Sequence, residues 1–104
     1  MTVKRLTQIA KRIEKIKAEL ASIEELRPGS LTRQYKDPES QSGPYYQLSY
    51  TRGMKSRTEY VPRDRVREVR RQIGNYKRFK ALTAEWIDLS IERSRLAIKL
   101  AHRP

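Results

Sequence analysis

The stretch LTQIAKRIEKIKAELASI, residues 6–23, repeats apolar side chains at alternating steps of three and four residues. A second series does the same in FKALTAEWIDLSIERSRLAIKL, residues 79–100. This heptad spacing predicts two helices, each with one apolar seam. Because the seams are equally long and lie at opposite ends of one short chain, we expect them to pair antiparallel as a coiled-coil stalk. The chain between them then forms a head on this stalk.

One charged residue interrupts the second seam. In the antiparallel alignment Leu20 faces Trp86, and Arg93 falls opposite Ile13. The aliphatic part of an arginine can pack while its guanidinium reaches solvent, so we expect Arg93 to extend from the seam to a carboxylate such as Glu14. The alternative is that Arg93 is buried and makes the pairing specific.

The two seams are compatible with two states of association. In the first, they form only the core of a single chain. In the second, they also drive dimerisation, because two paired helices leave an apolar flank uncovered at Ala10, Ile87, Ile91 and Ile98. A homodimer is therefore one of the two expected states.

Composition limits the classes of function. Only 37% of the 104 residues are hydrophobic, which predicts a single domain over residues 1–104 with a thin core. With no Cys and a lone histidine, His102, we expect no disulfide, no metal site and no cofactor. The serines have no histidine partner, so no enzyme activity is expected. The absence of a long apolar run or signal-like N-terminus favours a cytoplasmic protein.

Local signals divide the chain into four segments. A helix is expected over residues 2–27, and a loop rich in Ser, Asp, Pro and Gly over residues 28–43. A β-hairpin is expected over residues 44–61, with its turn near Gly53. A helix over residues 62–102 follows, with Pro62 in its first turn. This helix is either continuous or broken at Gly74, where the apolar spacing slips.

The hairpin holds a cluster of tyrosines. Strand alternation places Tyr46, Leu48 and Tyr50 on one face, which we expect to point inward. Tyr45 then lies on the other face and is the candidate for stacking on an exposed base. The alternative is that these tyrosines form a small amphipathic core with their hydroxyls at its edge.

The net charge of +12 predicts a polyanionic partner, and nucleic acid is the first class to consider. Residues 62–80 contain eight basic and two acidic side chains, whereas solvated faces usually mix both signs. The candidate phosphate contacts on this segment are Arg63, Arg67, Arg70, Arg71, Lys77, Arg78 and Lys80. The hairpin adds a cationic tip formed by Arg52, Lys55 and Arg57.

Several motifs, namely GPYYQLSY (43–50), RTEYVP (57–62), EVR (68–70) and NYKRF (75–79), resemble a family of short basic prokaryotic proteins of unassigned function. The resemblance spans about residues 28–100 and implies a hairpin with flanking coiled-coil helices. The family's association with mobile elements implies a nucleic-acid partner. Many members carry a Cys cluster before the GPYY motif. This chain has YKDPESQS (35–42) there, so no metal knuckle is implied.

The sequence thus predicts an α+β protein with an antiparallel two-helix stalk and a β-hairpin head. Its predicted function is non-catalytic binding of DNA or RNA through phosphate contacts, as a dimeric accessory factor in a larger complex. The alternative is a coiled-coil adaptor that binds an acidic protein. A third, weaker reading is binding at a membrane surface, without insertion into the bilayer.

Overall fold

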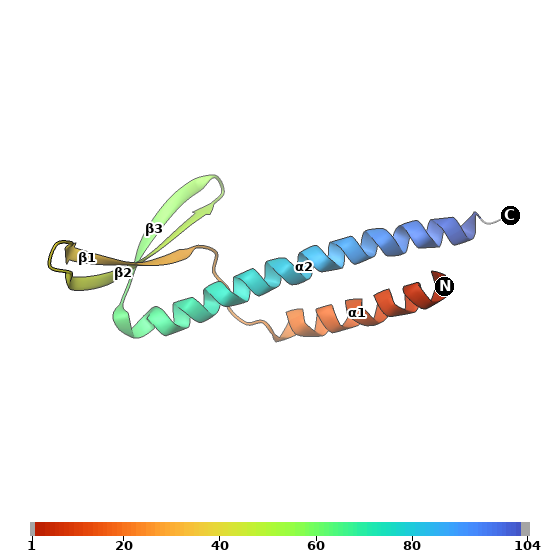
Figure 1. Cartoon of the computed structure of the whole chain (residues 1–104), viewed down its shortest axis with the longest axis horizontal. Coiled ribbons are helices and arrows are strands. Elements are labelled where there is room, and N and C mark those ends of the chain that lie inside the picture. Colours follow the sequence, from red (N-terminus) through yellow and green to blue (C-terminus); the bar gives the residue numbers. More distant parts are fainter. Residues whose placement is uncertain (1, 103–104) are drawn as a thin grey trace. The chain divides into compact units, whose positions relative to one another are not determined.

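The computed structural model describes residues 2–102. Its elements are α1 (Thr2–Ser22), β1 (Ser30–Asp37), β2 (Ser42–Arg52), β3 (Lys55–Val61), the short 3-10 helix η1 (Arg63–Arg65) and α2 (Val66–Ala101) (Figure 1). The architecture is α+β, which confirms the predicted class. Among residues 2–102, no helix has the length and hydrophobicity of a membrane-spanning segment.

The chain forms two compact units. The helical unit contains residues 1–24 and 78–104, and the sheet unit contains residues 25–77. Helix α2 is continuous from Val66 to Ala101 and contributes to both units. Gly74 lies inside this helix, so the expectation of an unbroken helix is confirmed and the alternative of two helices is wrong.

In the helical unit, α1 and the C-terminal part of α2 run antiparallel. Ile9, Ile13 and Ile16 of α1 are buried, as is Leu82 of α2. Three ion pairs connect the helices and fix their direction, since residues early in α1 bind residues late in α2. They join Arg5 to Glu92 (2.6 Å), Arg12 to Glu85 (2.6 Å) and Glu19 to Arg78 (3.6 Å). The individual pairs of apolar residues across the seam stay a prediction.

The structure differs from the predicted stalk in two details. The contact between Arg93 and Glu14 is not formed among the described residues: Glu14 instead accepts a hydrogen bond from Lys17 of its own helix (3.4 Å). Arg93 is exposed. Ala10, expected on the uncovered flank, is half-buried. The exposed flank therefore lies on α2 alone.

Helix α1 ends at Ser22, five residues before the expected end at residue 27. The following segment makes hydrogen bonds to α2 instead of continuing the helix. The backbone N–H of Arg27 donates to the Gln72 carbonyl (3.0 Å), and the Asn75 side chain donates to the Glu25 carbonyl (2.9 Å). Pro28 also disfavours helical backbone at the residue before it.

The sheet has three antiparallel strands in the order β1-β2-β3. The prediction of a β-hairpin is correct for β2 and β3, but the prediction of a loop over residues 28–43 is wrong because β1 occupies Ser30–Asp37. Leu31 of β1 pairs with Leu48 of β2, and Tyr35 pairs with Pro44. As an edge strand, β1 needs few apolar residues, which explains its loop-like composition.

The core of the sheet unit lies between the sheet and the first turns of α2. Its buried residues are Leu48, Val61, Val66 and Ile73, and the residues packed against them are Leu31, Tyr46, Tyr50 and Val69. This confirms that Tyr46, Leu48 and Tyr50 point inward. Gln72 is also buried, and its amide donates to the carboxylates of Glu25 (3.1 Å) and Glu68 (3.3 Å), so this polar group is satisfied.

Candidate nucleic-acid interface

A row of cations follows the buried edge of α2 in the sheet unit. Arg67, Arg70 and Lys77 each come one residue after an apolar or aromatic residue of α2, at Val66, Val69 and Tyr76. One residue corresponds to about 100° around a helix. The cations therefore lie beside the face that packs on the sheet, where long side chains can reach solvent. All three are exposed. We call Arg67, Arg70, Gly74 and Lys77 the α2 stripe.

A pocket of about 420 Å³ opens on this stripe. Its walls come from two parts of the sheet unit, the start of β1 with the residue before it and the N-terminal third of α2. The lining residues are Gly29, Ser30, Leu31, Arg70, Ile73, Gly74 and Lys77. Ile73 is buried, whereas Arg70 and Lys77 are exposed. The pocket thus has two cationic side chains at an opening that is otherwise lined by small, apolar and backbone groups.

Gly74 lies between the two cations, and the fold does not require a glycine there. Apart from its chain neighbours and the backbone of its own helix, a Cβ built on Gly74 has no atom within 4 Å, and the residue is within a regular helix. Glycine inside a helix costs about 1 kcal/mol relative to alanine. What the glycine provides is a bare stretch of helix backbone that a ligand can approach closely.

The spacing of the stripe suits a chain of phosphates better than one small anion. Arg70 and Lys77 are seven residues apart, which is roughly 10 Å along a helix axis. One strand of a duplex advances about 3.4 Å per nucleotide. The two side chains can therefore contact separate phosphates of one strand, with Gly74 below the backbone that joins them.

Not all the predicted cations belong to this surface. Arg71 is paired with Glu68 one turn earlier (2.5 Å), and this hydrogen bond is the main reason that the pKa of Glu68 is lowered. Arg78 forms its ion pair with Glu19 in the helical unit, which also contains Lys80. The expected single cluster over residues 62–80 is thus divided between the two units. Arg63 is exposed in η1, before the stripe.

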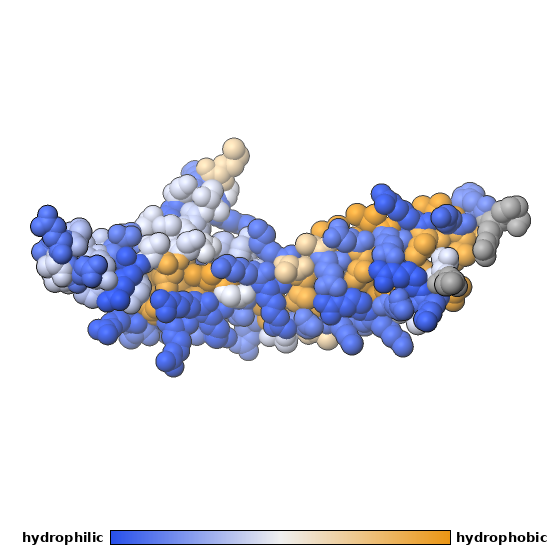
Figure 2. All heavy atoms as spheres, viewed as in Figure 1, coloured by the Kyte–Doolittle hydropathy of each residue, from blue (hydrophilic) through white to orange (hydrophobic). Residues whose placement is uncertain are grey.

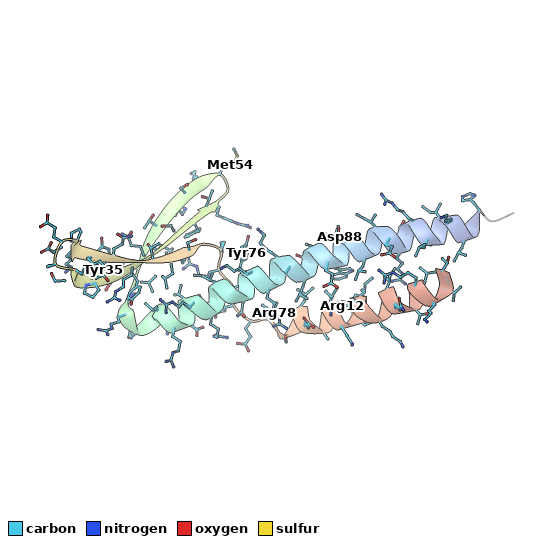
Figure 3. The ribbon with its side chains drawn as sticks, viewed as in Figure 1. Arg12, Tyr35, Met54, Tyr76, Arg78 and Asp88 are labelled. Atoms are coloured by element: carbon cyan, nitrogen blue, oxygen red, sulfur yellow. The ribbon has the colours of Figure 1, made fainter. Side chains whose placement is uncertain are left out.

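The predicted cationic tip is present at the turn between β2 and β3. Arg52 pairs with Lys55 across the last position of the hairpin, and Arg57 lies opposite Tyr50. Gly53 and Met54 form the turn, both with positive φ (59° and 64°). This is the backbone of a type I′ turn, which Gly and Asn usually occupy. The side chain of Met54 is 99% exposed at the apex of the hairpin (Figure 3).

Tyr45 lies in a second pocket of the sheet unit, of about 570 Å³, together with Tyr35, Lys36 and Tyr60. Tyr60 is 63% exposed, and Tyr45 is half-buried. The strand register pairs Tyr60 with Gln47, so Tyr45 and Tyr60 are diagonal neighbours on one face of the sheet. Tyr45 thus has the aromatic and cationic neighbours that a stacking site needs. Only Tyr45 was expected there, since the other three come from neighbouring strands.

One acidic residue of the sheet unit, Asp37, stabilises a turn. Asp37 accepts hydrogen bonds from the Ser40 hydroxyl (2.7 Å) and the Glu39 backbone N–H (3.2 Å) in the turn between β1 and β2. The Ser40 bond is the main cause of the lowered pKa of Asp37. Within residues 2–102, no group of three or more His, Cys, Asp or Glu side chains is arranged to hold a metal ion.

Comparison with known proteins identifies a family but no activity. The profile of a family described as a domain of unknown function (DUF6788) matches residues 6–71, which is well over half of the chain. The match covers α1 from Leu6 onward, the three strands and the start of α2. No curated protein and no solved structure matches. The chain therefore belongs to the family of the domain of unknown function DUF6788.

Proposed function

We propose that this protein binds nucleic acid without catalysing a reaction, and that the α2 stripe contacts the phosphates. The observation that carries the proposal is the position of Gly74 in the pocket between Arg70 and Lys77. A glycine that the fold does not need, between two exposed cations, is what close approach of a phosphate backbone requires. Arg67 extends the stripe by one turn.

The charges of the stripe are available to a ligand. No ion pair or hydrogen bond to a carboxylate is found for Arg67, Arg70 or Lys77 among the residues that the structure describes. By contrast, Arg5, Arg12, Arg27 and Arg71 are all held by glutamates. Neutralising phosphates with unpaired cations releases counterions, which is the main source of non-specific affinity for nucleic acid.

A second surface extends the proposal to single strands. Tyr45 and Tyr60, with Lys36 beside them, offer aromatic rings and a cation at one pocket of the sheet. Stacking of a base on an aromatic ring contributes about 1–3 kcal/mol per base, and only unpaired bases can stack there. We therefore propose that the α2 stripe binds any nucleic acid, while the Tyr45 pocket favours unpaired regions of DNA or RNA.

The runner-up is an adaptor that binds an acidic protein. Polyglutamate and nucleic acid are both polyanions, but only nucleic acid carries bases that can stack on aromatic rings. Because the proposed role is binding without catalysis, we propose that the protein is an accessory subunit of a larger complex. This would be a mobile-element or ribonucleoprotein complex. A dimer in that complex would carry two copies of the stripe.

The test is a direct comparison of four probes by fluorescence anisotropy at low salt. Labelled duplex DNA, single-stranded DNA, structured RNA and polyglutamate of equal length are titrated with the full chain. We expect micromolar or tighter binding to the nucleic acids, with affinity that falls steeply as salt rises. Binding of polyglutamate as tight as that of every nucleic acid would favour the adaptor instead. Anionic lipid vesicles, added as a competitor of labelled nucleic acid, test the hypothesis of binding at a membrane surface.

A further inference from the structure

The C-terminal half of α2 carries an apolar stripe that no residue among 2–102 covers. Ile87, Ile91 and Ile98 are 60%, 45% and 58% exposed. Figure 2 shows hydrophobic residues gathered over this part of the helical unit. A shallow pocket of about 670 Å³ runs along it, lined by Thr83, Trp86, Ile87, Ser90, Ile91, Ser94 and Arg95. Three exposed isoleucines on one helix face are typical of an interaction surface.

Two exposed charges flank this stripe on the same side of the helix. Asp88, labelled in Figure 3, and Arg95 are seven residues apart in the sequence, about two helical turns, and Ile91 lies between them along the helix. Neither has an ion pair among the described residues. The other acids in this part of α2, Glu85 and Glu92, are both bound by arginines of α1. One end of the stripe thus presents an unpaired acid, and the other end an unpaired base.

The positions of these charges define a symmetric pairing. In two antiparallel helices that face each other across a two-fold axis, residues on one side of a stripe meet residues on the same side of the partner's stripe. With the axis beside Ile91, Asp88 comes level with the partner's Arg95, and Arg95 with the partner's Asp88. Ile87 then lies near the partner's Ile98, and Ile91 meets the partner's Ile91. Ser94 and Ala84, being small, allow close approach.

We propose that this face binds the same face of a second copy of the chain, with the two α2 helices antiparallel. One register of the two helices brings the isoleucines of both copies together and also pairs Asp88 of each copy with Arg95 of the other. A parallel pairing would place Asp88 against the other side of the partner's stripe, where Ile87 and Ser94 lie, and would leave all four charges unpaired.

Sedimentation velocity on the full chain tests the pairing through its charges. We expect the wild type to form dimers within the range of about 1–500 µM, and Asp88→Arg or Arg95→Asp alone to weaken dimerisation at least about tenfold. An equimolar mixture of these two variants should form heterodimers, because one chain then presents two bases and the other two acids. The double variant Asp88→Arg with Arg95→Asp should regain the wild-type dimer.

Two further variants separate this pairing from a general effect of charge or folding. Lys15→Asp makes the same change of charge as Arg95→Asp at an exposed position of α1, and should leave the dimer unchanged. Ile91→Glu should give a monomer whose far-ultraviolet circular dichroism matches that of the wild type. A wild type that stays monomeric throughout this range would overturn the proposal. A mixture of the two single variants that associates no better than either alone would overturn it as well.

Discussion

Arg12 of α1 holds Glu85 of α2 at two points, with Nε 2.6 Å from Oε2 and Nη2 2.7 Å from Oε1. Arg5 and Glu92 repeat the arrangement at 2.6 and 2.8 Å, seven residues earlier in α1 and seven residues later in α2. The hydrogen bond from each guanidinium is the main reason that the pKa values of Glu85 and Glu92 are lowered. These pairs give the helical unit its antiparallel direction and a dependence on pH.

The two glutamates should make stability fall in acid. Their pKa in an unfolded chain is near the ordinary value of 4.5 and is lower in the folded state, so their contribution is fully present above 4.5. It is lost as the pH falls below 4.5 through the lowered values. We expect the melting temperature of the wild type to fall more between neutral pH and pH of about 3 than that of Glu85→Gln with Glu92→Gln. Parallel pH profiles would show that the pairs contribute nothing.

The buried isoleucines of α1 should dominate the stability of the helical unit. Ile9 and Ile16 are fully buried, so Ile9→Ala or Ile16→Ala should lower the free energy of unfolding by about 2–5 kcal/mol. Val3→Ala is the control, because Val3 is 67% exposed on the same helix and should change stability by less than about 0.5 kcal/mol. Urea denaturation followed by circular dichroism measures both. Equal effects at Ile9 and Val3 would contradict the packing described.

Two glycines should respond to alanine with opposite signs. Gly29 has φ of +126°, and a Cβ there would lie 2.6 Å from the Ser49 carbonyl oxygen. Gly29→Ala should therefore destabilise the protein by about 1–3 kcal/mol or more. Gly74 has open space and helical geometry, so Gly74→Ala should stabilise it by up to about 1 kcal/mol. Thermal melts of the two variants check this, and a destabilising Gly74→Ala would mean that the fold itself requires the glycine.

Bulk at Gly74 should block binding without any change in charge. In Gly74→Leu the side chain would occupy the space between Arg70 and Lys77, so we expect at least about tenfold weaker binding to duplex DNA. Ala18→Leu adds bulk to an exposed position of α1 and should bind as the wild type does. Anisotropy titrations at one fixed salt concentration compare the two. If Gly74→Leu binds normally, the ligand does not approach this part of the helix.

The sequence predicts the helices well because their signal is local and repeated. Leu6 to Ile23 keep one heptad pattern, and each turn adds to it. Strand β1 lacks such a signal, since Leu31 and Tyr35 are its only apolar residues. It forms because it pairs with the edge of β2 through hydrogen bonds. The periodicity of the β1 sequence does not reveal a partner that lies elsewhere in the chain.

The candidate site was predictable only in part for the same reason. Charge counting identified Arg70 and Lys77 but also Arg78, which Glu19 neutralises from a helix almost sixty residues away in the chain. The pairing of Arg71 with Glu68 was open to prediction, because the two are three residues apart on one helix. The pocket at Gly74 could not be predicted, because its second wall is formed by Gly29 and the residues next to it, which are distant in the sequence.

The most direct test of the account is the salt dependence of duplex binding in two matched double variants. Arg70→Ala with Lys77→Ala removes two charges from the α2 stripe, and Lys11→Ala with Lys15→Ala removes two exposed charges from α1. We expect the slope of log affinity against log salt to fall by about 2 for the first variant and to stay unchanged for the second, because each phosphate contact contributes about 0.9 to the slope. Equal losses in both variants, or no binding by the wild type at protein concentrations of about 10 µM in low salt, would contradict it.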